Sequence, residues 1–169
     1  MVPKFVDDDG RPMAGATGRH GLVSAEFIAA IRAHVVPRRL GPVFDGQTGV
    51  LLRRDPDVMR GPDVTYASWD RFPDDRVPDG RLDAPLDLVV EVLSPNDRAS
   101  EVQRKVRDYL NAGMRLVWVA DADNRIVTAY TPDGAARIHG ETDTLDGGDV
   151  LPELRIPVGP LFAFERPTK

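Results

Sequence analysis

Hydrophobic side chains recur at helical spacing near the start of the chain and at strand-like spacing further on. In residues 19–41 this helical set consists of Leu22, Phe27, Ile28, Ile31 and Val35. The spacing predicts a helix that ends before Pro37, since proline cannot continue a helix and Gly41 follows it.

Short strand-like runs come next. Residues 42–54 contain a turn at Asp45-Gly46, and in residues 62–68 the side chains of Val64 and Tyr66 alternate with polar ones. Residues 70–85 are rich in proline and charge and predict an exposed loop. Residues 87–93, "DLVVEVL", form the most strand-like run of the first hundred residues.

A second helix is predicted after this strand. Ser100 and Gln103 fit a capping box, and Gly113 fits the stop after about three turns. Three further strands are predicted at 115–121, 124–132 and 154–164. The order of elements favours an α/β or α+β fold, in which a sheet is flanked by helices, over a sandwich.

Composition narrows the class of protein. A chain of 169 residues with 41% hydrophobic content predicts one domain, here 19–169, after a loose arm at 1–18. The absence of cysteine and of an apolar leader suits the cytoplasm. No apolar run is long enough to span a membrane, so no membrane partner is expected. The net charge of −5 argues against a general nucleic-acid coat protein but not against a local basic site.

Two carboxylates interrupt the apolar strand at 87–93. Asp87, Val89, Glu91 and Leu93 should share one face, because alternate side chains of a strand point the same way. Asp87 and Glu91 lie roughly 13 Å apart along it, too far to share one ion easily. Asp87 is expected to face water or cap the loop, whereas Glu91, in the middle of the strand, needs a cation.

Two residues are candidates to accompany Glu91. Asp63 opens the neighbouring run at 62–68, and would approach Glu91 if that run pairs with 87–93. Lys105 lies at the edge of the inward stripe of the second helix, one turn from Tyr109, while Arg104 points away. Two hard carboxylates suit Mg²⁺ or Mn²⁺, and a lysine beside them can stabilise charge on a phosphoryl group. Two carboxylates, a divalent ion and a lysine together suit the hydrolysis of a phosphodiester.

Four segments in this order resemble the Uma-two family: "GPDVTYAS", "DLVVEVLSPNDR", "KVRDYLNAGMRLVWVAD" and "VLPELRIPVGPLF". It is a bacterial family of restriction-endonuclease-like proteins in the PD-(D/E)XK nuclease superfamily. The resemblance covers about residues 18–165. It implies a mixed β-sheet flanked by helices and a metal-dependent endonuclease that hydrolyses DNA.

The resemblance also implies site residues. Asp63 matches the first acid of the motif and Glu91 the second, both as metal ligands and catalytic residues. The superfamily places its lysine two positions after the second acid, where this chain has Leu93. Members of the family resemble one another in carrying the lysine on the next helix, which matches Lys105, with Tyr109 one turn on. Because cutting both strands of a duplex favours two-fold symmetry, a homodimer is expected.

Other interpretations remain open. Glu91 could pair with a buried Arg115, and Lys105 could extend to solvent. His20, His34 and His139 show no ligand spacing, although His20 stands just before the first helix, where an accessory site residue is possible. Tyr109 and Asp87 are the other possible accessory residues.

Three classes of function therefore compete. The first is the endonuclease. The second is a non-catalytic module that binds nucleic acid or protein on a nuclease fold. A glycosidase-like carboxylate pair ranks last, because it has no use for a lysine and the chain holds only 7% aromatic residues.

Overall fold

The computed structural model describes residues 17–83, 86–95 and 97–165. The helices are α1 (Gly18–Arg38), α2 (Ala99–Asn111), α3 (Val158–Leu161) and two 3₁₀ turns, η1 (Trp69–Arg71) and η2 (Pro73–Asp75). The strands are β1 (Val43–Asp45), β2 (Val50–Arg53), β3 (Val58–Arg60), β4 (Val64–Tyr66), β5 (Leu88–Val92), β6 (Leu116–Asp121), β7 (Ile126–Tyr130), β8 (Ala136–His139), β9 (Thr144–Gly147) and β10 (Leu151–Pro157). Most of the predicted arm, residues 1–16, lies outside the described residues.

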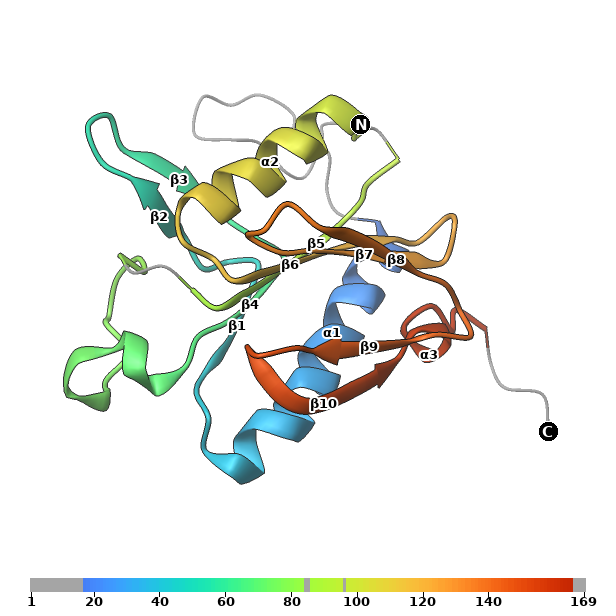
Figure 1. Ribbon diagram of the computed structural model, residues 1–169, viewed down its shortest axis with the longest axis horizontal. Coiled ribbons are helices and arrows are strands. Elements are labelled where there is room, and N and C mark those ends of the chain that lie inside the picture. The colour runs from blue at the N-terminus through green and yellow to red at the C-terminus, as the bar shows by residue number, and fades with distance from the viewer. Residues whose placement is uncertain (1–16, 84–85, 96, 166–169) are drawn as a thin grey trace, which may run out of the picture.

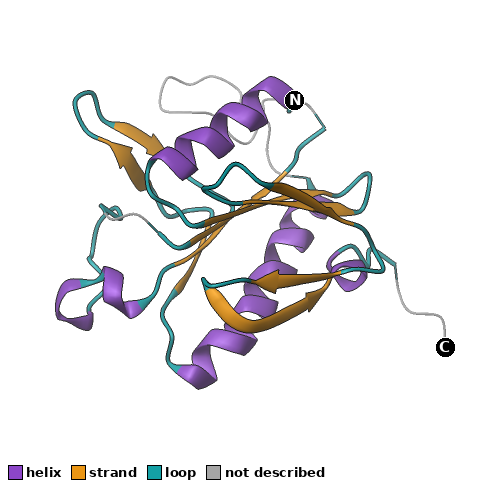
Figure 2. Ribbon diagram, in the orientation of Figure 1, coloured by secondary structure: helices purple, strands orange, loops and turns teal. Residues whose placement is uncertain are grey.

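A six-stranded sheet in the order β1-β4-β5-β6-β7-β8 forms the centre of the molecule. The pair β5-β6 is parallel and its neighbours are antiparallel, so the sheet is mixed. Helix α2 covers one face, and α1 covers the other together with the β9-β10 hairpin (Figures 1 and 2). The predicted fold class, a mixed sheet flanked by helices, is confirmed.

Each face of the central strand β5 contributes to a separate hydrophobic cluster. Leu88, Val90 and Val92 pack on the α1 side, while Val89 packs with residues of α2 such as Val106. This is the alternation that the sequence predicted for residues 87–93. Because both faces of β5 are covered, every side chain in it is buried, including the carboxylate of Glu91.

The first helix differs from its prediction at both ends of the apolar stripe. Phe27, Ile31 and Val35 are fully buried, but Leu22 is exposed, and Val23 takes its place in the core. The helix also continues through Pro37 to Arg38 and ends on Arg39, which adopts a left-handed conformation. Pro37 lacks a backbone N–H and so removes one hydrogen bond from this last turn, and the helix ends two residues after it.

Helix α2 begins without the predicted capping box. Arg98 is the N-cap and its side chain makes no capping hydrogen bond, so Ser100 lies inside the first turn. The predicted end is confirmed, since the helix stops at Asn111 and Gly113 has a φ of 93°. Tyr109 of this helix is buried against the sheet.

Two other segments depart from the predicted pattern. The run 154–164 is a strand only as far as Pro157, after which α3 begins. The loop 70–85 is not wholly exposed, because Phe72 and Leu82 are buried in the core on the α2 side. No helix among the described residues is long and apolar enough to cross a membrane.

Candidate active site

The pairing of β4 with β5 brings two acidic residues together. Val64 is the register partner of Val90 in this antiparallel pair. One step further, Asp63 therefore stands opposite Glu91, and its Oδ2 accepts a hydrogen bond of 2.7 Å from the backbone N–H of Val92. The predicted pairing of 62–68 with 87–93 is present, and it places the two carboxylates at one end of the sheet.

Two side chains of α2 donate hydrogen bonds to Glu91. Glu91 itself is only 6% exposed. The Nζ of Lys105 donates to its Oε2 at 2.7 Å, and the Tyr109 hydroxyl donates to its Oε1. Lys105 does not extend away to solvent, and Arg115 does not pair with Glu91 but lies 3.7 Å from Asp87. Of the interpretations left open by the sequence, the cation from α2 is the one that the structure contains.

Burial and charge oppose each other in their effect on the pKa of Glu91 and of Lys105, and act in the same direction on that of Tyr109. Burial raises the pKa of Glu91, and the charge and hydrogen bond of Lys105 only partly offset it. Burial lowers the pKa of Lys105, but the attraction of Glu91 outweighs it and leaves that pKa above its ordinary value. Burial and the Glu91 charge both raise the pKa of Tyr109, which keeps its hydroxyl a donor.

His20 reaches the same site from the opposite face of the sheet. It lies in the first turn of α1, not before the helix, and Thr17 caps that turn by accepting from its backbone N–H. Its Nε2 lies 3.3 Å from Oδ1 of Asp63. The hydrogen bond to Asp63 raises the pKa of His20 against the opposing effect of burial. The accessory position expected for His20 is therefore beside Asp63.

Asp87 has one of the two environments predicted for it, since it bonds to the loop and does not face water. It is 2% exposed, so the expectation that it faces water is wrong. Its Oδ2 accepts from the backbone N–H of Ser68 at 2.8 Å, and its Oδ1 accepts from Arg71. These bonds tie the loop after β4 to the start of β5. Asp87 lies at the other end of the strand from the Asp63–Glu91 pair.

One contact that supports the site was missed from the sequence. Arg60 of β3 donates to Asp108 of α2 at 2.7 Å and so links the β2-β3 hairpin to the helix that carries Lys105 and Tyr109. The two residues are 48 positions apart. Only the tertiary structure brings them together, and no local pattern pointed to the pair.

The donor set fits a divalent ion of the magnesium type. Each carboxylate oxygen of Asp63 and Glu91 uses one acceptor position for a protein donor and has capacity for another bond. Within the described ranges, no group of three or more His, Asp or Glu side chains is placed to hold a metal. Mg²⁺ commonly uses only one or two carboxylates, with water and substrate oxygens completing its shell. Asp63 and Glu91 therefore offer as many carboxylate ligands as a Mg²⁺ ion commonly uses.

A cavity of about 610 Å³ opens beside the cluster. It lies between the start of α1, the loop after β5 and the turn between β6 and β7, and its lining includes His20, Leu93 and Asn124. Leu93 packs on the core of the α2 side. Its described lining contains His20 of the cluster but not Asp63, Glu91 or Lys105.

The central sheet is mixed, two acids lie opposite each other across the β4-β5 pair, and the adjoining helix contributes a lysine. These features define a protein of the restriction-endonuclease-like class. Residues 3–159 match the model of the Uma2 (Uma-two) family, whose description is "Putative restriction endonuclease". The chain belongs to this family.

A solved structure supports the assignment of the fold. The chain is similar to a crystal structure described as a putative nuclease belonging to DUF820, from Anabaena variabilis ATCC 29413. The two share 22% sequence identity with a TM-score of 0.75, over 87% of this chain and 82% of that one. A comparison with curated proteins found no match.

Proposed function

We propose that this protein is a metal-dependent endonuclease that hydrolyses phosphodiester bonds in DNA. The observation that carries the proposal is the placement of Lys105 Nζ 2.7 Å from Glu91, which itself stands opposite Asp63 across the β4-β5 pair. Membership of a family whose description is "Putative restriction endonuclease" supports the same conclusion.

Asp63 and Glu91 are the residues that would hold Mg²⁺ or Mn²⁺. Such an ion, when bound, supplies Lewis-acid chemistry and neutralises charge on a phosphate. The hydrogen bond from Val92 N–H fixes the orientation of Asp63, and the Tyr109 hydroxyl fixes that of Glu91. A carboxylate pair held in this way loses little conformational entropy when it takes up an ion.

Lys105 is the residue proposed to act on the phosphate. Its ammonium has three N–H donors, and Glu91 receives one of them, which leaves two for a phosphoryl oxygen. The side chain is 35% exposed, so a substrate can reach it, whereas Glu91 behind it is buried. A positive charge fixed at this place favours the negative charge that develops during phosphoryl transfer.

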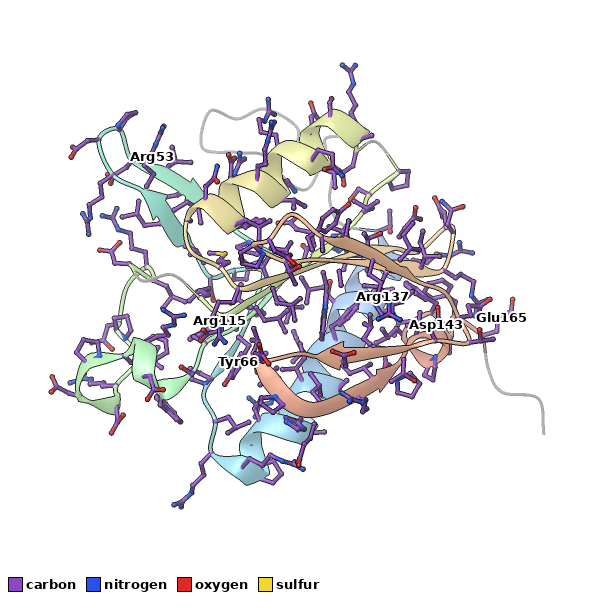
Figure 3. The ribbon with its side chains drawn as sticks, viewed as in Figure 1. Arg53, Tyr66, Arg115, Arg137, Asp143 and Glu165 are labelled. Carbon is purple, nitrogen blue, oxygen red and sulfur yellow. The ribbon has the colours of Figure 1, made fainter. Side chains whose placement is uncertain are left out.

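The outer surface of α2 supports a nucleic-acid substrate. The segment 98–115 holds five Lys or Arg residues against two acids. Arg98, Arg104 and Arg107 are exposed, and none is ion-paired with another described residue. Arg53 lies on the β2-β3 hairpin, which the Arg60–Asp108 contact links to α2 (Figure 3). Clustered cations of this kind bind a phosphate backbone in a salt-dependent way.

The test is a cleavage assay on supercoiled, linear duplex and single-stranded DNA with Mn²⁺ or Mg²⁺. The native protein should cut at least one form, and Glu91→Gln should not, because it removes the charge but little volume. Thermal unfolding of both proteins establishes that the variant is folded. Calorimetry should show Mn²⁺ binding to the native protein and none to Glu91→Gln.

The alternative is a module that binds nucleic acid or protein without catalysis. It predicts DNA binding without cleavage and no thermal stabilisation by Mn²⁺, because a ligand stabilises only a fold that binds it. Unchanged Mn²⁺ affinity in Glu91→Gln would show that Glu91 is not a ligand and would refute the proposed site.

A further inference from the structure

The two acids of the proposed active site are held in place from different helices. Glu91 accepts hydrogen bonds from two side chains of α2. Asp63 lies one residue before β4, and its carboxylate is held by the backbone of Val92 and by His20 of α1. The N–H of Val92 donates to Oδ2 at 2.7 Å, and Nε2 of His20 lies 3.3 Å from Oδ1. Each carboxylate oxygen of Asp63 therefore has a protein partner, and the partner of Oδ1 is a side chain of α1.

The helix α1 uses the backbone of His20 and leaves its side chain to the contact with Asp63. The backbone N–H of His20 donates to the Thr17 hydroxyl at 3.2 Å, and its carbonyl oxygen accepts from the Ser24 hydroxyl at 2.9 Å. The hydrogen bond to Asp63 is the main cause that raises the pKa of His20, and the backbone of Val92 adds to the rise. His20, Asp63 and Val92 therefore form one connected group that joins α1 to the β4-β5 pair.

The contact between His20 and Asp63 is partly removed from water. The two side chains are 13% and 21% exposed, whereas a fully exposed pair of this kind would be screened and would contribute little. A carboxylate oxygen has two acceptor positions, so the imidazole on Oδ1 leaves the second position open for an ion. Carboxylates that bind metals commonly carry an outer hydrogen bond of this type, which fixes their orientation.

We propose that His20 is a positioning residue, which holds Asp63 in the orientation that binds a divalent ion together with Glu91. The proposal rests on the proposed function, in which Asp63 and Glu91 are the ligands. It adds the first turn of α1 to the metal site, with His20 as an outer contact and not as a ligand. Without the imidazole, Asp63 would keep the bond from Val92 but would be free to turn Oδ1 away from Glu91.

The experiment is calorimetric titration of the full chain with Mn²⁺. His20→Ala should weaken Mn²⁺ binding about tenfold or more, as is typical when the outer partner of a metal ligand is removed. His20→Gln keeps an N–H donor at about the reach of Nε2 and should bind Mn²⁺ within a few-fold of the native protein. Thermal unfolding establishes that both variants are folded.

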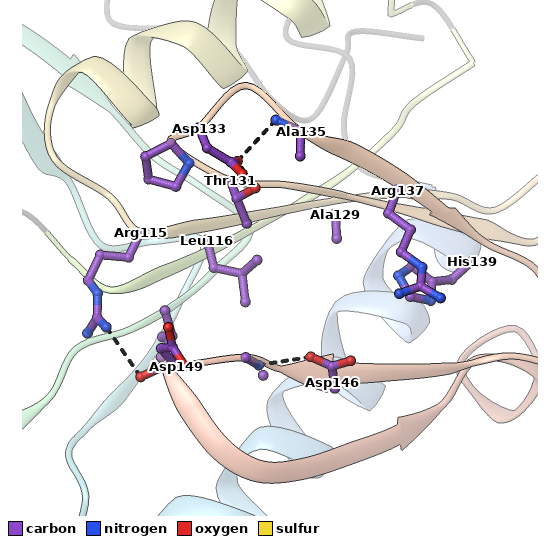
Figure 4. A pocket seen from close by; sticks show the side chains of 14 residues that line it. Arg115, Leu116, Ala129, Thr131, Asp133, Ala135, Arg137, His139, Asp146 and Asp149 are labelled. Atoms are coloured by element: carbon purple, nitrogen blue, oxygen red, sulfur yellow. Dashed lines mark hydrogen bonds between the residues drawn. The ribbon is translucent and has the colours of Figure 1, made fainter.

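The other two histidines of the chain are the matched controls. His34 lies on the same helix, is buried, and its Nε2 bonds to no described residue. His139 is buried on β8, three strands from β5 across the sheet, where it lines a hollow beside Arg137 (Figure 4). His34→Ala and His139→Ala should lower the melting temperature and leave the Mn²⁺ affinity unchanged, because neither side chain bonds to Asp63 or Glu91.

Cleavage at saturating Mn²⁺ distinguishes a positioning residue from one that touches the substrate. A weakened affinity is overcome by mass action, so His20→Ala should then cut DNA at close to the native rate, whereas Glu91→Gln should not. A rate of His20→Ala that stays low at saturating Mn²⁺ would place His20 against the substrate and overturn the positioning role.

The titration separates failure of this proposal from failure of the proposed function. If Glu91→Gln loses Mn²⁺ binding but His20→Ala binds as tightly as the native protein, the metal site stands and the role of His20 is overturned. If the native protein binds no Mn²⁺, or Glu91→Gln binds it unchanged, both proposals are overturned. Equal losses in His20→Ala and His34→Ala would assign the effect to the stability of α1 and overturn the role of His20. The same holds if His20→Gln recovers no affinity.

Discussion

Replacing Asp87 by asparagine should destabilise the fold more than any exposed substitution in the same loop. The side chain is 2% exposed and accepts from Ser68 N–H at 2.8 Å and from Arg71 Nη2 at 2.7 Å and Nε at 3.1 Å. Removing one partner of a buried ion pair costs about 3–5 kcal/mol. Arg71 is 28% exposed and can recover some hydration, so we expect the lower end, about 3 kcal/mol.

The same ion pair predicts a dependence of stability on pH. Burial alone raises the pKa of Asp87, but the hydrogen bonds from Arg71 and Ser68, with the charges of Arg71 and Arg115, together hold that pKa below its ordinary value. A carboxyl whose pKa is lowered by folding stabilises the fold above its unfolded pKa. The contribution is lost as the pH falls through the folded pKa. The difference between native protein and Asp87→Asn should therefore be full at pH 7 and shrink below about pH 4.

The assay is urea and thermal unfolding followed by circular dichroism at pH 7 and pH 3. For a chain of this size, 3 kcal/mol corresponds to a melting temperature lower by roughly 6–12 °C. Asp70→Asn is the matched control, because Asp70 is exposed on the same loop and should change stability by no more than about 0.5 kcal/mol. Equal effects of the two substitutions at pH 7, or a difference that persists undiminished at pH 3, would contradict the reasoning.

Three further predictions concern the proposed nuclease. Lys105→Ala should lower the cleavage rate about 100-fold or more and leave Mn²⁺ binding intact or tighter. Arg104→Ala should only weaken DNA binding, in a salt-dependent way. Equal effects of the two substitutions on rate and affinity would indicate a generally basic helix. Asp63→Asn should abolish Mn²⁺ binding in calorimetry as Glu91→Gln does, and the double variant should add little, since both residues serve one ion; additive losses would argue for separate sites. Light scattering should give a mass twice the 18.6 kDa of one chain; the monomer mass at all micromolar concentrations would refute the homodimer.

The sequence predicted the candidate site through features that are local. Glu91 stood out because a carboxylate in an apolar strand needs a cation, and Lys105 because helical geometry turned it toward the sheet. The partner of Asp87 could not be predicted in this way. Arg71 lies in an irregular loop, where no repeating spacing fixes the direction of a side chain, and only the folded loop brings it to the start of β5.

The lysine that accompanies Glu91 shows why spacing along the chain is a weaker guide than position in space. In the superfamily pattern the lysine follows the acid by two residues, and alternate residues of a strand share a face. Leu93 occupies that position here and packs on the core of the α2 side. The helix α2 covers the same face, so a lysine from its inward edge approaches Glu91 from above and reaches 2.7 Å. The proposed phosphodiester hydrolysis would need an ammonium group on that face within reach of the acid, and either the strand or the helix packed against it can provide one.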